Sequence, residues 1–279
     1  MPALLKALKK IQLRDLPWRH TKDPYKILVS EIMLQQTQVE RVVPFYIRFV
    51  RQFPNAKTLA KAPLSKVLKA WQGLGYNRRA VYVRRSAKSL SKKSSGFPSG
   101  AATGPAGQTF SPELFATRLP GVGPYTAAAV EAFAYNKPTV FIETNIRTVF
   151  IHHFFRSHIL KNNRISDKEI LPLIEQALKK SKMPPREFYY RLMDYGTLLK
   201  KQGIRLNLKS THYVKQKKFE GSYRQLRGKI LRALLVEPAT LNQLLKITGR
   251  KQSDVVRTLA TLSSEGLIKL KQKRFNIAK

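Results

Sequence analysis

Two glutamates of this chain stand in surroundings that could give them complementary chemistry. Glu31 lies in the apolar run Ile27–Leu34, where desolvation disfavours the charged form of a carboxyl group and raises its pKa. Glu143 directly precedes a predicted helix, which Thr144 or Asn145 can cap, and the positive helix end is expected to keep it ionised. A proton-donating carboxyl group and an anionic one form the pair that cleaves glycosidic bonds. On spacing alone, Glu31 also fits an exposed position, and Glu143 also fits a residue that only stabilises the helix dipole.

A glycine-rich turn lies between two predicted helices, where residues 119–126 read LPGVGPYT. Gly121 and Gly123 allow a tight turn with exposed backbone N–H groups, and Pro124 can start the next helix. Amides at a helix N-terminus suit a phosphate oxygen. An ordinary helix–helix turn has similar features, but the whole string resembles the helix-hairpin-helix element of DNA repair proteins. We therefore expect Gly121, Val122 and Gly123 to contact DNA.

The charge of the chain is extreme for a folded protein. Among 279 residues, 53 Lys and Arg face 16 Asp and Glu, which gives a net charge of +37, and 43% of the residues are hydrophobic. So much unbalanced charge repels itself, which indicates a polyanionic partner. Nucleic acid is the first candidate, and an anionic membrane surface is the second.

Several site types are disfavoured by composition. The chain has no Cys, which excludes disulfides, thiol catalysis, Cys-ligated zinc and Cys-held iron–sulfur clusters. His152, His153 and His158 cluster on one predicted helix without further ligands at metal spacing, so we expect no metal and no cofactor. We find neither an apolar run of about 18 to 20 residues nor a secretory signal. These observations predict no membrane partner and a location in a prokaryotic cytoplasm.

Helical periodicity dominates residues 1–199 and predicts an all-α body. A loop rich in Ser, Gly, Ala and Pro is expected at Ser91–Pro112, and residues 200–221 form a basic connector. Residues 222–279 are expected to be a small winged-helix-like domain, although an interaction domain that never touches DNA would have the same pattern. The expected helices are Pro24–Leu34, Val39–Arg51 with a kink or restart at Pro44, Pro63–Gln72, Arg78–Leu90, Pro112–Arg118, Pro124–Tyr135, Asn145–Phe155, Asp167–Ser181, Pro185–Leu199, Ser222–Leu235, Thr240–Thr248 and Ser253–Glu265, before a terminal hairpin in Gly266–Ala278.

Five motifs occur in an order that resembles one enzyme family. They read LPWR at 16–19, SEIMLQQTQ at 30–38, WQGLGY at 71–76, LPGVGPYT at 119–126 and MDYG at 193–196. Together they look like an adenine DNA glycosylase of the MutY type, within the helix-hairpin-helix endonuclease III superfamily. The resemblance covers roughly residues 14–199. It implies two α-helical subdomains with double-stranded DNA between them, and flipping of the target base into a pocket.

The resemblance also implies roles for the catalytic candidates. It puts Glu31 at the general acid that protonates the departing adenine, and Glu143 at the carboxylate that stabilises the sugar oxocarbenium ion. Asn145 matches an asparagine of the same site. Tyr125 stands where relatives with lyase activity have the Lys that forms a Schiff base, so we expect a monofunctional hydrolase.

Further positions match residues that contact DNA in the family. Gln36, Leu74 and Tyr76 correspond to residues that probe or wedge the duplex around the lesion. Leu34 offers an apolar wedge, and Gln35 and Gln36 offer amides that can bond base edges. Taken singly, Leu34 also fits a core position and the glutamines also fit solvated ones. The pocket wall is expected to include Trp18 and Arg19, and simple core packing is the alternative for Trp18 and Tyr76.

Three features of this chain depart from the family. Glu143 replaces the usual Asp, the four cysteines of the family's iron–sulfur cluster are missing, and the C-terminal domain does not resemble the Nudix-like domain that reads 8-oxoguanine. We expect a monomeric base excision repair enzyme that removes adenine opposite 8-oxoguanine or guanine, without a cluster. The alternatives are a thymine or uracil mismatch glycosylase and a non-catalytic DNA-binding regulator that uses the winged helix.

Overall fold

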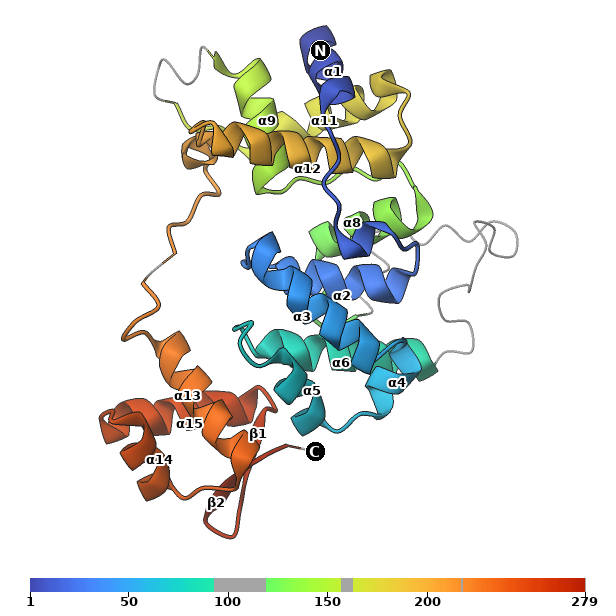
Figure 1. Cartoon of the computed structure of the whole chain (residues 1–279). Coiled ribbons are helices and arrows are strands. Elements are labelled where there is room, and N and C mark those ends of the chain that lie inside the picture. Colours follow the sequence, from blue (N-terminus) through green and yellow to red (C-terminus); the bar gives the residue numbers. More distant parts are fainter. Residues whose placement is uncertain (93–118, 157–162, 217, 279) are drawn as a thin grey trace. The chain divides into compact units, whose positions relative to one another are not determined.

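The computed structural model describes residues 1–92, 119–156, 163–216 and 218–278. Within these ranges the chain is mostly helical, as the sequence predicts, and its named strands are the two of the C-terminal hairpin (Figure 1). The loop expected at Ser91–Pro112 lies outside the described residues from position 93 on. So does the helix expected at Pro112–Arg118. No helix of the described part is long and apolar enough to cross a membrane.

The chain divides into two compact units. Among the described residues, unit 1 comprises 1–27 and 122–215, and unit 2 comprises 28–92, 119–121 and 216–278. Helix α2 (Pro24–Leu34) begins in unit 1 and ends in unit 2. The other elements of unit 1 are α1 (Pro2–Lys10), η1 (Pro17–Arg19), α8 (Pro124–Tyr135), α9 (Thr144–Phe154), α11 (Asp167–Ser181), α12 (Pro185–Lys201) and η2 (Leu206–Lys209).

In unit 1, α12 packs along α9, and α1 and α11 also contact α12 (Figure 1). The crossing of α12 and α9 is very close at Gly196. A Cβ atom at this position would lie 2.4 Å from the backbone oxygen of Asn145, so only glycine fits. The start of α9, where two candidate site residues lie, is therefore held directly against the backbone of α12.

Unit 2 contains two groups of elements. The first consists of the end of α2, α3 (Val39–Gln52), α4 (Ala56–Lys61), α5 (Leu64–Trp71) and α6 (Arg78–Lys92). The second consists of α13 (Tyr223–Val236), α14 (Leu241–Thr248), α15 (Gln252–Ser264), β1 (Ile268–Lys271) and β2 (Arg274–Ile277). The strands pair antiparallel, with Leu270 opposite Phe275. Three helices and a hairpin are the elements that the sequence predicts here, while the domain boundaries at 199 and 221 stay predictions.

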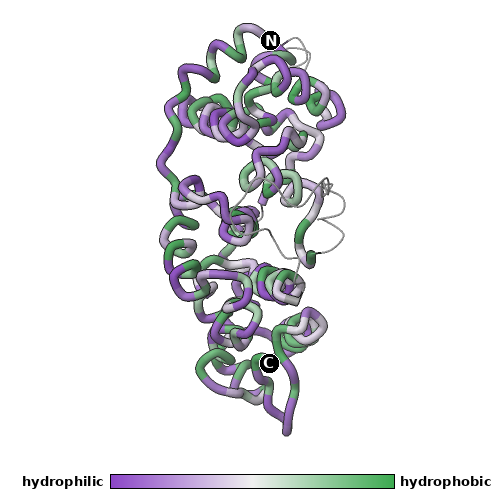
Figure 2. The backbone as a smooth tube through the Cα atoms, turned by 90° about the vertical axis from the view of Figure 1, so that its right-hand side faces the viewer, coloured by the Kyte–Doolittle hydropathy of each residue, from purple (hydrophilic) through white to green (hydrophobic). Residues whose placement is uncertain are grey.

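The observed helices differ from the expected ones in a few places. The sequence analysis missed α1 and α4. Helix α3 continues through Pro44 without the expected restart. A proline inside a helix removes a single backbone hydrogen bond, and this helix buries Val42, Tyr46 and Phe49 on one face. The alternation of hydrophobic and hydrophilic residues along the tube in Figure 2 fits helices with one buried face.

The basic connector is more ordered than expected. Helix α12 runs to Lys201, η2 follows, and Ile165 forms an isolated parallel bridge with Ser210. The Ile165 amide donates to Lys209 (3.0 Å), and the Thr211 amide donates to Ile165 (3.0 Å). The first half of the connector is thus fastened to unit 1 by backbone hydrogen bonds.

Arginine side chains complete the C-terminal ends of several helices. The last carbonyl groups of a helix have no intrahelical partner. Arg191 donates to the carbonyls of Leu8 and Ile11 at the end of α1 (3.0 and 2.8 Å), and Arg186 donates to that of Ala134 near the end of α8 (2.9 Å). The guanidinium charge also suits the negative end of a helix.

A buried acid ties α12 to the N-terminal segment of unit 1. Asp194 accepts hydrogen bonds from Arg19 (2.7 and 2.9 Å) and from Nε of Arg14 (2.6 Å). Its side chain is 3% exposed. Burial raises the pKa of Asp194, but the hydrogen bonds from Arg19 and Arg14 outweigh this effect and hold the pKa below its usual value of 3.8.

We expect Asp194→Asn to lower the free energy of unfolding by about 3 kcal/mol at neutral pH, because the partly buried guanidinium groups of Arg14 and Arg19 lose their counter-charge. The native state holds the Asp194 proton less tightly than the unfolded state. The stabilisation is therefore present above pH 3.8 and is lost as the pH falls below it. Urea unfolding between pH 3 and pH 7 should show a smaller acid-side loss in the variant.

The control is Glu175→Gln, which breaks an exposed ion pair with Lys179 on α11. It should change the stability by less than about 0.5 kcal/mol. Equal effects of the two variants would contradict the role of Asp194.

Candidate functional site

The end of α2 carries the first group of candidate residues. Glu31 is buried, with 5% of its surface exposed, among Leu28, Ile32 and other buried residues of the helix. The exposed alternative for Glu31 is therefore wrong. Leu34 and Gln35 are partly buried, and Gln36 is exposed.

Gln36 has a left-handed backbone, with φ of 57°. Such a conformation is uncommon for residues other than glycine, and the surrounding structure must enforce it. Arg79 of α6 provides that support. Its Nη1 donates to the carbonyls of Ile32 (2.9 Å), Met33 (2.8 Å) and Gln35 (2.6 Å). The guanidinium thus closes the C-terminal end of α2 directly before Gln36.

Arg79 also holds the turn that follows α5. Its Nη2 donates to the carbonyl of Gly75 (3.2 Å), which also accepts a hydrogen bond from the indole of Trp71 (3.2 Å). Tyr76, the next residue, has a left-handed backbone with φ of 49°. One buried guanidinium therefore connects the two segments that carry Gln36 and Tyr76. Burial lowers the pKa of Arg79 to about 10, so this group stays charged at neutral pH.

The expected wedge residues differ in accessibility. Tyr76 is partly exposed, whereas Leu74 is 4% exposed and packs in the core of unit 2. In this structure Tyr76 can therefore reach a ligand without rearrangement, and Leu74 cannot.

The glycine-rich turn has one residue with a left-handed backbone. Gly121 has φ of 77°, and a Cβ atom there would lie 2.6 Å from Cβ of Tyr82. Gly123 is the N-cap of α8 and has no side-chain cap. Val122 is buried. Tyr125 lies in the first turn of α8 with its ring edge-on to Phe141, at 5.7 Å between centroids.

Glu143 caps α9 with its own side chain. Its Oε1 accepts from the amides of Asn145 (2.8 Å) and Ile146 (2.9 Å), and Oε2 accepts from the Asn145 side chain (3.2 Å). The expectation that Thr144 or Asn145 would be the cap is therefore wrong. A glutamate side chain is long enough to reach the amides of the first turn from the N-cap position, and it takes that place here.

Burial and the helix end act on the pKa of Glu143 in opposite directions. Burial raises the pKa of this carboxyl group, and the amides of Asn145 and Ile146 together with the charge of Arg147 oppose the effect only in part. The sequence-based expectation considered the helix end alone and left out this burial, and the ionised state of Glu143 stays a prediction.

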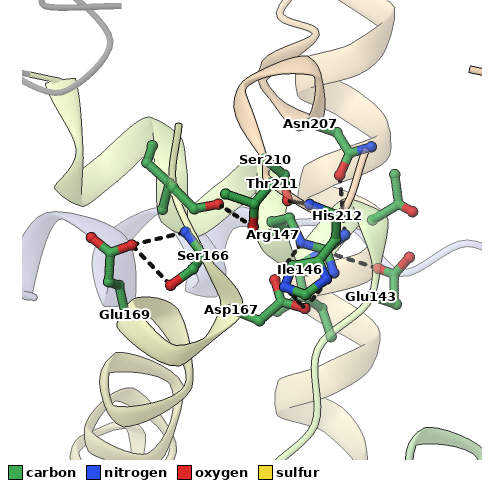
Figure 3. Close-up of polar contacts among 12 residues, drawn as sticks. Glu143, Ile146, Arg147, Ser166, Asp167, Glu169, Asn207, Ser210, Thr211 and His212 are labelled. Atoms are coloured by element: carbon green, nitrogen blue, oxygen red, sulfur yellow. Dashed lines mark hydrogen bonds and ion pairs between the residues drawn. The ribbon is translucent and has the colours of Figure 1, made fainter. Parts of the chain in front are cut away.

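Arg147, one helical turn beyond Glu143, fastens three segments of unit 1 (Figure 3). Its guanidinium binds both carboxylate oxygens of Asp167 at the start of α11 (2.7 and 2.8 Å), and its Nη1 donates to Asn207 in η2 (3.1 Å). Nε2 of His212 lies 3.7 Å from the same carboxylate. The paired charges hold α9, α11 and the connector together next to Glu143.

Trp18 and Arg19 of η1 are held within unit 1. Trp18 is 5% exposed. Arg19 is bound to Asp194, and its guanidinium carbon lies 4.4 Å from the centre of the Tyr190 ring. The expected pocket-wall role of these two residues stays a prediction, and the structure gives Arg19 a clear architectural one.

The histidines of α9 pack against aromatic rings. His153 shares a hydrogen bond with the Tyr195 hydroxyl (2.9 Å), and burial lowers its pKa to about 4. His158 lies outside the described residues. Across the described ranges, no group of three or more His, Cys, Asp or Glu side chains is placed to hold a metal ion.

The candidate residues thus fall into two groups. Unit 2 contains Glu31 and brings Gln35 and the Tyr76 turn together around Arg79. Unit 1 brings Glu143 and Asn145 together. The meeting of Glu31 and Glu143 at one site stays a prediction.

The sequence analysis missed the arginines and acids that position these groups, namely Arg79, Arg147, Asp167 and Asp194. Asp194 lies inside the MDYG motif at 193–196, and this motif could have marked it as a positioning residue. Arg79 and Arg147 carried no such signal, because in a chain with so many cations a buried arginine looks like a solvated one.

We expect Arg79→Lys to lower the free energy of unfolding by about 2 to 4 kcal/mol, because an ammonium group cannot reach several carbonyls at once and leaves buried acceptors unpaired. Hydrogen exchange should also accelerate at the end of α2. Arg78→Lys is the matched control, since Arg78 is exposed, and it should change the stability by less than about 0.5 kcal/mol. Similar stabilities of the two variants would contradict the role of Arg79.

Known proteins resemble this chain over much of its length. An adenine DNA glycosylase of Buchnera aphidicola subsp. Baizongia pistaciae is 37% identical over 187 residues, which cover 67% of this chain and 48% of the relative. An adenine DNA glycosylase of Mycobacterium tuberculosis is 39% identical over 137 residues, covering 49% of this chain and 41% of the relative. The chain therefore spans about half the length of these relatives or less.

A solved structure described as a thermostable thymine-DNA glycosylase is also similar. It has a TM-score of 0.54 and 28% identity, and the match covers 71% of this chain and 84% of that one. Residues 29–176 match the family described as HhH-GPD superfamily base excision DNA repair protein. The chain belongs to this HhH-GPD superfamily.

Proposed function

We propose that this protein is a DNA glycosylase of base excision repair, which hydrolyses the bond between adenine and deoxyribose in mispaired double-stranded DNA. The adenine DNA glycosylases at 37% and 39% identity carry this proposal. The net charge of +37 supports a polyanionic substrate. The mispairs proposed are adenine opposite 8-oxoguanine or guanine, and the protein is proposed to act as a monomer, associated with DNA in a prokaryotic cytoplasm.

Glu31 is the proposed proton donor. A buried carboxyl group favours its neutral form, and only that form can deliver a proton to the departing adenine. Protonation makes adenine a neutral leaving group, and the C–N bond electrons leave with the base. The burial of Glu31 among apolar residues of α2 supports this role.

Glu143 is the proposed stabiliser of the positive sugar. Its carboxyl group is oriented by the amides of Asn145 and Ile146. Its anionic form would attract the positive charge that develops on the sugar as the oxocarbenium ion forms. A water molecule would then complete the hydrolysis.

The proposed enzyme works without an iron–sulfur cluster. The family resemblance implies four cysteine ligands after the segment 193–199, and this chain has none. The residues that follow α12 form η2 and the bridge to Ile165 instead. Arg147 and Asn207 fasten this segment to α9, so side-chain and backbone hydrogen bonds serve where a cluster would organise the chain.

A thymine or uracil mismatch glycosylase is the second candidate. The similarity to a thymine-DNA glycosylase at 28% identity favours it. A non-catalytic DNA-binding protein that uses the winged helix is the third. The same set of duplexes separates all three.

We expect the purified protein to release adenine from labelled duplexes with adenine opposite 8-oxoguanine or guanine, detected as strand cleavage after alkali. Glu31→Gln should lower the single-turnover rate by at least about a hundredfold, because the proton donor is removed. Its duplex binding should persist in a gel-shift assay.

Glu40→Gln is the control, since Glu40 is exposed on α3, and it should keep the wild-type rate. Release of thymine or uracil would favour the second candidate. Binding without release of any base would favour the third.

We expect no covalent enzyme–DNA product when borohydride is added during turnover, because Tyr125 has no amine to form a Schiff base. Denaturing electrophoresis of labelled duplex measures this trapping. Tyr125→Lys should introduce a trapped species if residue 125 lies beside the sugar. A trapped species with the wild-type protein would contradict a monofunctional mechanism.

A further inference from the structure

Tyr76 is bound by residues from a distant part of the sequence within unit 2. Nη1 of Arg224, at the start of α13, donates to the Tyr76 hydroxyl at 2.7 Å. The side-chain amide of Gln216 donates to the same hydroxyl at 2.5 Å. Two donors that come from the C-terminal part of the chain therefore meet at the exposed tip of the Tyr76 turn.

Aromatic rings and cations alternate around this point. The Tyr76 ring lies near two guanidinium groups, at 5.2 Å from that of Arg79 and 5.5 Å from that of Arg224. Arg224 also lies 5.9 Å from the ring of Phe219, which is 57% exposed. An exposed aromatic ring next to a guanidinium plane is a surface on which a nucleic acid base can stack.

The charges of this stretch suit DNA. Lys218 is exposed beside Phe219, and it can contact a phosphate group. Glu220 is the acidic residue in the segment 216–224, and its carboxylate accepts a hydrogen bond from the Gln225 side chain (2.6 Å). Arg224 and Gln216, by contrast, present N–H groups at the tyrosine.

The donors indicate which base would bind. In the major groove guanine presents two acceptors, O6 and N7, whereas adenine presents one acceptor and one donor, and cytosine presents a donor. Arginine is a common partner of the guanine edge for this reason. A site built from a guanidinium, an amide donor and the rings of Tyr76 and Phe219 therefore fits a guanine-type base better than a pyrimidine, because a guanine edge presents two acceptors.

We infer that Tyr76, Gln216, Phe219 and Arg224 form a base-reading subsite for the guanine-type base opposite the excised one. The inference rests on the proposed function, because Tyr76 is expected to contact the duplex around the lesion. Under this assignment the C-terminal part of the chain contributes to the choice of mispair, through the residues that precede and begin α13.

Binding to intact duplexes tests the subsite without any turnover. The full-length protein is titrated into fluorescent duplexes that carry a 2′-fluorinated deoxyadenosine, which resists base release, opposite guanine, 8-oxoguanine or cytosine. We expect the wild-type protein to prefer the guanine-type duplexes to the cytosine duplex by about tenfold. Arg224→Gln should abolish most of that preference.

Arg232→Gln is the matched control, because it removes the same charge from an exposed position of the same helix. It should weaken binding to all duplexes alike and keep the preference. Tyr76→Phe keeps the ring and removes the hydroxyl that positions both donors, so it should lower the preference in part. Thermal unfolding verifies that each variant is folded. If Arg224→Gln does not fold, Tyr76→Phe provides the test.

The outcomes separate this inference from the proposed function. A wild-type protein without preference for guanine-type bases, or variants that keep the full preference, would overturn the subsite even if adenine is released. A wild-type protein that prefers these bases but releases none would support the subsite and overturn the glycosylase proposal.

Discussion

Guanidinium groups that donate to backbone carbonyls hold much of this fold together. The chain has too few acids to pair with its arginines, and buried cations need partners. Carbonyl groups at helix C-termini need donors in turn. Arg191 serves the end of α1, Arg79 the end of α2, Arg84 the residue after α4, and Arg186 the end of α8. A strongly basic chain thus satisfies both needs with one contact.

Three acids help to position the candidate residues. Asp194 joins η1 to α12, and Asp167 joins α9 to α11 through Arg147. Glu143 is held by the amides at the start of α9. Arg79 plays the corresponding part in unit 2, where it supports the left-handed residues Gln36 and Tyr76. Backbone strain of this kind persists only when neighbouring contacts impose it, so the accessible residues depend on buried ones.

Much of the fold could be predicted from the sequence, because periodicity and capping residues mark the helices. Helix α11 begins and ends where the sequence predicts. Helix α4 was missed because it is short, and α1 because its apolar spacing was not considered. The backbone order of the connector was not predicted, because a single bridge at Ser210 leaves no periodic pattern in the sequence. Candidate residues followed from motifs, but the contacts of Arg79 depend on tertiary structure alone, and no local pattern reveals the burial that raises the pKa of Glu143.

The contact between Gly196 and the start of α9 has a consequence for how this protein can vary. Two helices meet there at main-chain distance, so the spacing between them is set by atoms that every amino acid shares. Any side chain at position 196 would push the start of α9 away from α12. The place of the Glu143 carboxyl group therefore depends on a residue that has no side chain.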